Sequence, residues 1–213
     1  MAMNNRITRI FNRLLLGLLA GYCLAACSGE TEKSAVLFPM DSLITSQIKY
    51  LTEAKATVQK TAILGNAVDR RTLTPPDSTP LAVFRELEAI NKPINRDAYI
   101  IDDGLTDVRS NLKVKVFTAK VDEDEGGSWI QSNPFPITSL RIYYRDVPKN
   151  IRRIEAAVQE ENSLFTSARH FLLEFQEIHG TIVLTSYAIT GGQKMYLGDT
   201  VRYSVKGSIT LPN

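Results

Sequence analysis

Between residues 99 and 209, the chain contains a series of short segments in which apolar and polar side chains alternate. The clearest segment covers residues 112–116, where three apolar residues alternate with two lysines. Successive side chains of a strand point to opposite faces, so this pattern predicts strands with one buried and one exposed face. Further segments rich in β-branched residues and tyrosine lie at 139–145, 181–187 and 201–209. These signals predict an antiparallel sheet of about seven to nine strands, and sheets of that size curl or close.

The N-terminal third is different, because its apolar residues recur at helical spacing. Pro39 precedes a segment with Ile44, Ile48 and Leu51 on one face, which predicts a helix. Residues 57–64 alternate and predict a strand, and residues 72–80 contain three prolines and predict a loop. Pro80 then begins a second helix that Pro93 ends. Its apolar stripe consists of Leu81, Phe84, Leu87 and Ile90.

Together these elements predict an α+β fold: a large curved antiparallel sheet, open or half-barrel-like, with two N-terminal helices packed on it. The face that carries Leu112, Val114 and Val116 is expected to pack on the helices, and Lys113 and Lys115 to face water. The strand that begins at residue 99 is expected to end at an acidic turn, residues 102–104. Gly191 and Gly192 are expected to mark a bulge or kink in a curved strand.

Residues 151–176 fit two structures. As a helix, the segment would have Leu164, Ala168, Phe171, Leu172 and Phe175 on one stripe. As strands, Phe171, Leu173 and Phe175 would share one face. A turn signal at residues 161–163 divides the stretch into two pieces of strand length, which favours a hairpin.

The N-terminus has the pattern of an export signal. Three arginines and no acidic residue precede a short apolar run, which is shorter than the roughly 20 residues that a membrane-spanning helix needs. The sequence Leu24-Ala25-Ala26-Cys27 then resembles the lipobox of bacterial lipoproteins. That resemblance implies that diacylglycerol is attached to the Cys27 thiol, that residues 1–26 are removed as a signal peptide, and that the new N-terminus is acylated.

The expected mature chain is a flexible tether, residues 27–37, followed by a single α+β domain, residues 38–213. The full chain has a net charge of +2, with 25 basic and 23 acidic residues. Removing the three leader arginines leaves 22 basic residues against 23 acidic ones, so the mature chain has a charge of −1. No basic stripe of the kind that binds nucleic acid is present. The only cysteines are Cys23 and Cys27, so no disulfide is expected in the mature domain.

Three short motifs extend the lipoprotein resemblance. They are Asn91-Lys92-Pro93 after the second helix, residues 162–167 and residues 187–193. In this order the chain resembles uncharacterised envelope lipoproteins of Bacteroidetes, over most of its mature length. Its predicted order, a helix followed by a long series of antiparallel strands, is also similar to the half-barrel of outer-membrane lipoprotein carriers. Neither resemblance implies an activity or a catalytic residue, because fold does not determine function.

Few residues suggest catalysis or metal binding. If residues 165–178 were helical, His170, Glu174 and Glu177 would share a face as a metal trio, but a solvated polar face explains them more simply. The acidic residues 122–125 do not have the spacing of a calcium-binding EF-hand and predict a solvated hairpin tip. We therefore expect no catalytic residue, no metal and no cofactor. Trp129 and Phe135 lie near a predicted loop, where they either cap the core or contact a partner or lipid.

The sequence thus predicts a non-enzymatic envelope protein anchored by acyl chains, with the outer membrane as its location, on the periplasmic face or the cell surface. Ser28 supports that location, since it is not the Asp that retains many lipoproteins in the inner membrane. Its expected role is to bind an envelope protein as an accessory subunit of an outer-membrane assembly. The alternatives are a carrier of lipid or another apolar ligand in the concave face of the sheet, and a hydrolase with an unrecognised site. A filled sheet face with an exposed edge would favour the first role, and exposed apolar residues on a concave sheet the second.

Overall fold

A computed structural model describes residues 36–74, 79–120 and 136–212. All of these residues belong to one compact unit, Val36–Asn213.

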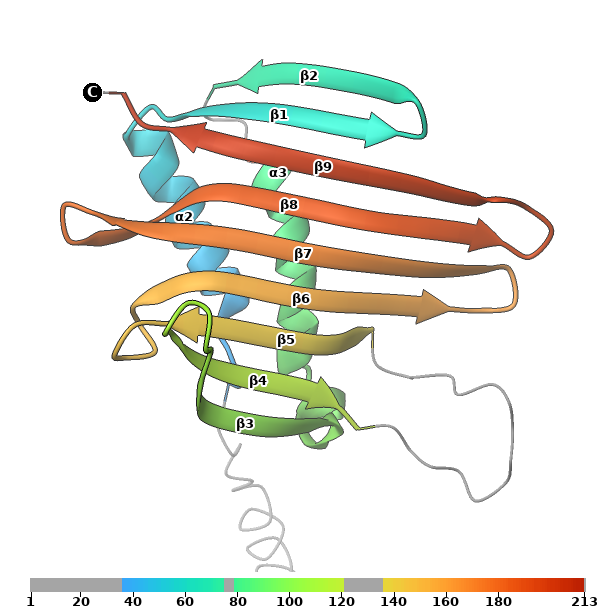
Figure 1. Cartoon of the computed structure of the whole chain (residues 1–213), viewed down its shortest axis with the longest axis horizontal. Helices are drawn as coiled ribbons and strands as arrows, with labels where there is room; N and C mark the ends of the chain where they lie inside the picture. Colours follow the sequence, from blue (N-terminus) through green and yellow to red (C-terminus); the bar gives the residue numbers. More distant parts are fainter. Residues whose placement is uncertain (1–35, 75–78, 121–135, 213) are drawn as a thin grey trace, which may run out of the picture. The chain divides into compact units, whose positions relative to one another are not determined.

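The main element of the fold is one antiparallel sheet of nine strands, in the order β2-β1-β9-β8-β7-β6-β5-β4-β3 (Figure 1). The sheet is open, with β2 and β3 as its two edges. Strands β3 to β9 follow one another as a meander, and β1 pairs with the last strand, β9. The predicted α+β fold with a large antiparallel sheet is confirmed. The strands are β1 (Thr57–Leu64), β2 (Ala67–Leu73), β3 (Tyr99–Thr106), β4 (Lys113–Ala119), β5 (Ile137–Tyr144), β6 (Ile151–Glu161), β7 (Phe165–Ile178), β8 (Thr181–Met195) and β9 (Thr200–Thr210).

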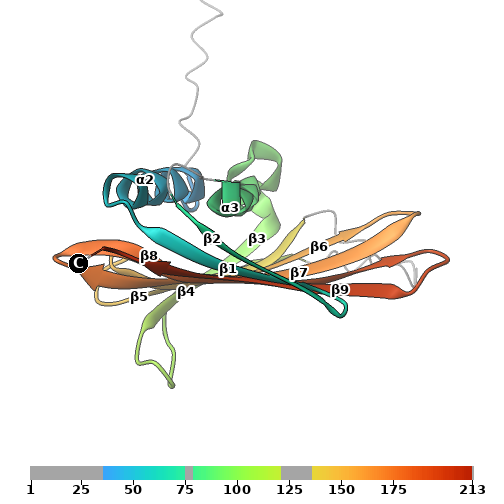
Figure 2. The ribbon, with the colours of Figure 1, turned by 90° about the horizontal axis from the view of Figure 1, so that it is seen from above.

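The predicted helices lie on one face of this sheet (Figure 2). The first is α2, Met40–Glu53. The second begins as a short α-helix, α3 (Thr79–Ala82), and continues as 3-10 helices η1 (Val83–Asn91) and η2 (Pro93–Ala98). The 3-10 geometry suits the stripe from Leu81 to Ile90, whose members are three residues apart, because side chains at i and i+3 are eclipsed in a 3-10 helix. All four members of that stripe are buried.

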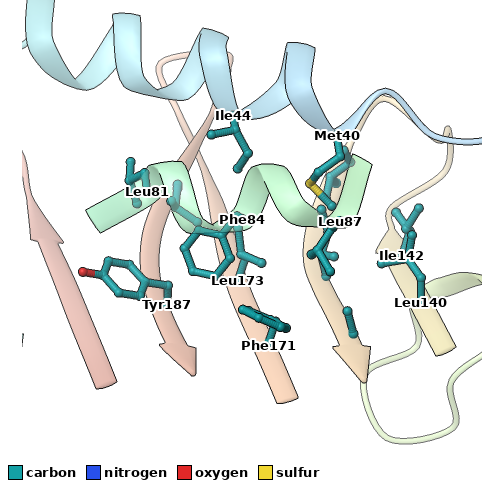
Figure 3. Close-up of a cluster of buried hydrophobic side chains, with 14 of the residues drawn as sticks. Met40, Ile44, Leu81, Phe84, Leu87, Leu140, Ile142, Phe171, Leu173 and Tyr187 are labelled. Atoms are coloured by element: carbon teal, nitrogen blue, oxygen red, sulfur yellow. The ribbon is translucent and has the colours of Figure 1, made fainter. Parts of the chain in front are cut away.

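The hydrophobic core fills the space between these helices and the sheet (Figure 3). Phe84 lies at its centre and is fully buried. Its ring packs edge-to-face against Phe171, at 5.8 Å between centroids, and against Tyr187, at 5.5 Å. Aromatic pairs of this geometry stabilise a core beyond the effect of buried area alone. The helix-facing side of the sheet is therefore a packed interior.

Residues 151–176 form the predicted hairpin rather than a helix. Strands β6 and β7 pair in register from Arg153↔Glu174 to Glu161↔Thr166. The side-chain oxygen of Asn162 accepts hydrogen bonds from the backbone N–H groups of Leu164 and Phe165, at 2.8 and 3.0 Å. This Asx-type turn explains why the chain reverses here.

Two strands differ from the prediction. Strand β2 was not predicted, and six of its seven residues are exposed. Strand β3 does not end at the acidic turn but continues to Thr106, with a register irregularity between Asp102 and Leu105. Gly104 lies in this irregularity at a φ of +80°, which glycine adopts readily. The turn prediction was therefore wrong, because a local irregularity within the strand accommodates these residues.

The alternation predicted for β4 is correct, but the face assignment is wrong. Phe117 and Ala119 belong to the core cluster under the helices, and Val114 is buried outside that cluster. Val114 lies on the opposite face, because strand alternation separates it from Phe117. The β3–β4 turn projects from the sheet on that side (Figure 2). Lys115 is consequently on the helix side, where its Nζ lies 3.1 Å from Asp103 and 5.5 Å from the centroid of the Phe117 ring.

Two glycines make room for tyrosines on the neighbouring strand. Gly207 on β9 is directly opposite Tyr187 on β8, and Gly191 on β8 is opposite Tyr203 on β9. A Cβ at Gly207 would meet the Tyr187 ring at 2.2 Å, and one at Gly191 would meet the Tyr203 hydroxyl at 2.7 Å. The predicted bulge at Gly191 and Gly192 is absent, since both keep continuous register with β7 and β9. Position 191 instead requires glycine because the Tyr203 side chain lies close to its backbone.

The side chain of Gln47 joins helix α2 to the sheet. Its amide donates to the carbonyl of Ile182, at 3.0 Å, and accepts from the backbone N–H of Leu184, at 2.8 Å. Pairing between β8 and β9 begins only at Ser186, so this end of β8 has no strand on its β9 side. Gln47 thus satisfies backbone groups that a neighbouring strand would otherwise bind.

Replacing Gln47 by leucine is expected to lower the free energy of unfolding by about 2 kcal/mol, because a buried N–H and a buried C=O lose their partners. Chemical denaturation of a soluble chain that begins at Ser28 measures this loss. Gln59→Leu is the matched control, since Gln59 is exposed on β1, and it should change stability by less than about 0.5 kcal/mol. Equal losses in both variants would contradict a bridging role for Gln47.

Candidate binding face

The side of the sheet that faces away from the helices is its helix-free face (Figure 2). Strand alternation assigns to it the residues next to those that enter the core. On the central strands most of these residues are small or polar. They are Ser139, Arg141 and Tyr143 on β5, Arg153, Glu155 and Ala157 on β6, His170, Leu172 and Glu174 on β7, and Ser186, Ala188 and Thr190 on β8.

A groove of about 430 Å³ crosses the middle of this face. Two rows of directly paired residues produce it. In one row Ala157 separates Ser139 from His170, and in the next Leu172 separates Glu155 from Ala188. The alanines and the serine leave a hollow, and longer side chains stand around it. The groove is lined by Ser139, Arg141, Glu155, Ala156, Ala157, His170, Phe171, Leu172, Ala188 and Thr190.

A hydrogen-bonded network holds the acidic side of the groove in place. Glu155 accepts a hydrogen bond from the Tyr143 hydroxyl, at 2.9 Å, and lies 3.5 Å from Arg153. Arg153 also lies over the Tyr143 ring, 5.5 Å from its centroid. Desolvation raises the pKa of the Tyr143 hydroxyl, and its hydrogen bond to the Glu155 carboxylate raises that pKa further. Tyr143 therefore remains a neutral donor at physiological pH, and the carboxylate keeps one orientation.

Beside this network, Arg141, His170 and Thr190 are exposed. The groove thus offers a cation, a carboxylate, an imidazole and hydroxyls around a floor of small apolar side chains. Such a set can hydrogen-bond to polar groups of either charge and accept a small apolar group between them. Among the described residues, neither Ser139 nor Thr190 forms a side-chain hydrogen bond with His170, the contact that would activate a nucleophile.

The metal trio considered for a helical segment does not form. Residues 165–178 are a strand, so His170 and Glu174 point to the helix-free face and Glu177 to the other, where it binds Arg152 at 2.7 Å. No group of three or more metal-binding side chains occurs in the described part of the chain. Nor is any helix there long and apolar enough to cross a membrane.

The residues singled out from the sequence, Cys27, Trp129 and Phe135, lie outside the described residues, as do the acidic residues 122–125. The groove residues were not predicted as a site. Their signal in the sequence is weak: polar and small residues alternate with core residues in the same strands, and which of them lie side by side depends on strand register. Comparison with protein-family models, with curated proteins and with solved structures finds no match to this chain.

Proposed function

We propose that this chain is a non-enzymatic, lipid-anchored envelope protein of the outer membrane that binds another protein through the groove of its helix-free face. In this role it is an accessory subunit, fixed to the membrane by Cys27 and presenting its sheet to a partner.

The observation that carries the proposal is the difference between the two faces of the sheet. One face is filled by helices and core, and the other carries a groove with charges of both signs and no helix packed on it among the described residues. Partially polar surfaces with small hollows are typical of interfaces between separately folded proteins. The outer edge strand β2 is exposed as well, with Asp69 and Arg71 paired at 2.9 Å. Charged side chains on an edge strand discourage edge-to-edge pairing with another sheet. A partner protein is therefore expected to bind the helix-free face rather than this edge.

The two alternatives have less support. An apolar-ligand carrier that used the helix-free face would need a mainly apolar lining, whereas Arg141, Glu155 and His170 line the groove. A hydrolase would need a nucleophile in contact with its base.

Filling the groove tests the proposal. The soluble chain that begins at Ser28, immobilised by its C-terminus, is used to capture proteins from solubilised envelopes, and each captured protein is quantified by mass spectrometry. Ala188→Trp places a bulky ring in the groove and should reduce capture of the specific partner at least tenfold, about 1.4 kcal/mol. Ser46→Trp, on the exposed side of α2, is the matched control and should leave capture unchanged. Equal capture by the wild-type chain and the Ala188→Trp variant would refute the groove as the binding site.

A further inference from the structure

A second cavity lies on the other side of the sheet, beside the start of the helix that runs from α3 into η1. It has a volume of about 270 Å³. Its walls are mainly apolar, and they come from α3, η1 and four strands. The cavity is lined by Lys60, Pro80, Val83, Arg169, Phe171, Tyr187, Ile189, Tyr203 and Val205.

Tyr187 is the unusual member of this lining. Its side chain is 3% exposed, and its ring is fixed between Phe84 and Gly207. Its hydroxyl is buried and forms no hydrogen bond within the described part of the chain. Figure 3 shows this hydroxyl pointing away from the aromatic cluster around Phe84. Since buried hydroxyls are nearly always paired, this unpaired hydroxyl, on a residue that lines the cavity, indicates a missing partner.

Desolvation raises the pKa of the Tyr187 hydroxyl to about 12. The group is therefore protonated at neutral pH and can donate one hydrogen bond. A ligand acceptor atom can satisfy this donor.

Of the two cations that line the cavity, only Arg169 is paired with carboxylates among the described residues. Arg169 donates to both oxygens of Glu86, at 2.7 and 3.1 Å, and to Glu160, at 2.7 Å. Lys60, in contrast, is half-buried and forms no ion pair within the described residues. Lys60 is paired with Gly207, which is paired in turn with Tyr187, so lysine and tyrosine stand in one row across three strands. The row therefore places a lysine and a hydroxyl donor, neither of them paired among the described residues, beside the same cavity.

We propose that this cavity binds a small apolar carboxylate, whose carboxyl group contacts Lys60 and the Tyr187 hydroxyl and whose apolar body packs on Phe171, Ile189 and Val205. At the packing density of protein interiors, about 0.74, the cavity holds a ligand of about 200 Å³, which is the size of a medium-chain fatty acid. This site is independent of the groove on the helix-free face, so either proposal can fail without the other.

Isothermal titration calorimetry of the soluble chain with decanoate tests the inference. We expect saturable binding at one site, and at least tenfold weaker binding of decanol, which has the same apolar body without the charge. Tyr187→Phe and Lys60→Met should each weaken decanoate binding about tenfold, since each removes one contact to the carboxylate. Lys206→Met is the matched control, because Lys206 is exposed on β9 and faces the other side of the sheet; it should bind decanoate as the wild type does.

Thermal melting without ligand separates loss of binding from loss of folding. Tyr187→Phe keeps the ring and removes an unpaired buried hydroxyl, so its melting temperature should equal or exceed that of the wild type. Absence of saturable binding to the wild-type chain would overturn the proposal. So would wild-type affinity in both the Tyr187→Phe and Lys60→Met variants, or an equal loss in Lys206→Met.

Discussion

Replacing Gly207 by alanine is expected to lower the free energy of unfolding by about 3 kcal/mol, through overpacking of the core. The added methyl group would lie 2.2 Å from two atoms of the Tyr187 ring, far inside van der Waals contact. The ring cannot move away freely, because its other face packs on Phe84 in the centre of the core. Either the strands separate or the edge-to-face contact is lost. Domains of this size have a total stability of only about 5–15 kcal/mol, so the change is severe.

Gly192→Ala is the matched control for this prediction. Gly192 lies on the adjacent strand, β8, where the nearest atom to an added Cβ is the Thr200 Cγ2 at 3.5 Å, an ordinary contact. Glycine inside a strand is less favourable than alanine, so this variant should lose no stability. In a double-mutant cycle, Tyr187→Ala should cost far less in the Gly207→Ala chain than in the wild type. Additive effects of the two changes would contradict the proposed contact.

Replacing Cys27 by serine is expected to abolish lipid attachment completely. The proposed modification forms a thioether with the Cys27 thiol, and the serine hydroxyl is a much poorer nucleophile. Cells that express the variant should incorporate no labelled palmitate into the protein, which should keep its leader. It should also be lost from the outer-membrane fraction, because the proposed acyl chains would supply the anchor, at about 0.8 kcal/mol per buried CH₂.

Cys23→Ser is the control for the anchor, since Tyr22 precedes Cys23 where a lipobox has a small residue. It should be labelled and processed as the wild type is. Palmitate labelling of Cys27→Ser, or loss of labelling in Cys23→Ser, would refute Cys27 as the site of modification.

The sheet could be predicted because most of its strands have one face in the core. The period is clearest in β6 and β7, where every second residue is buried over 154–158 and 171–175, and it is visible in the sequence. The hairpin at residues 151–176 was predicted for the same reason, with Asn162 marking its turn. Strand β2 lacks the signal, because an edge strand that is exposed on both faces has no need to alternate.

Other features depend on distant parts of the chain. Alternation shows which residues of β4 share a face, but the position of the helices and of the β3–β4 turn decides which face is covered. The apolar residues from Leu81 to Ile90 predict a buried helix. Apolar residues spaced three or four apart are compatible with both an α-helix and a 3-10 helix, so the sequence does not show which of the two forms. The hydrogen bonds of Gln47 could not be predicted from the sequence either, because its two partners lie 135 and 137 residues away along the chain.

Neither candidate site could be predicted from the sequence. The groove exists because Ala157 and Ala188 are small and Ser139 lies opposite Ala157, a relation that register alone establishes. Small residues in a strand give no sign of a hollow. The proposed site beside α3 rests on the Tyr187 hydroxyl, which has no hydrogen-bond partner among the described residues, and an unpaired atom is visible only in three dimensions.

The pairing of β1 with β9 also constrains when the fold can be completed. Every other pair of strands joins neighbours in the sequence, so those hairpins can form as soon as their residues are available. Thr57, however, pairs with Thr210 on β9, the last of the described strands in sequence order. Closing such a long loop is entropically costly and slows folding. During synthesis, therefore, β1 and β2 can form only their own hairpin, and they join the sheet after β9 has been made.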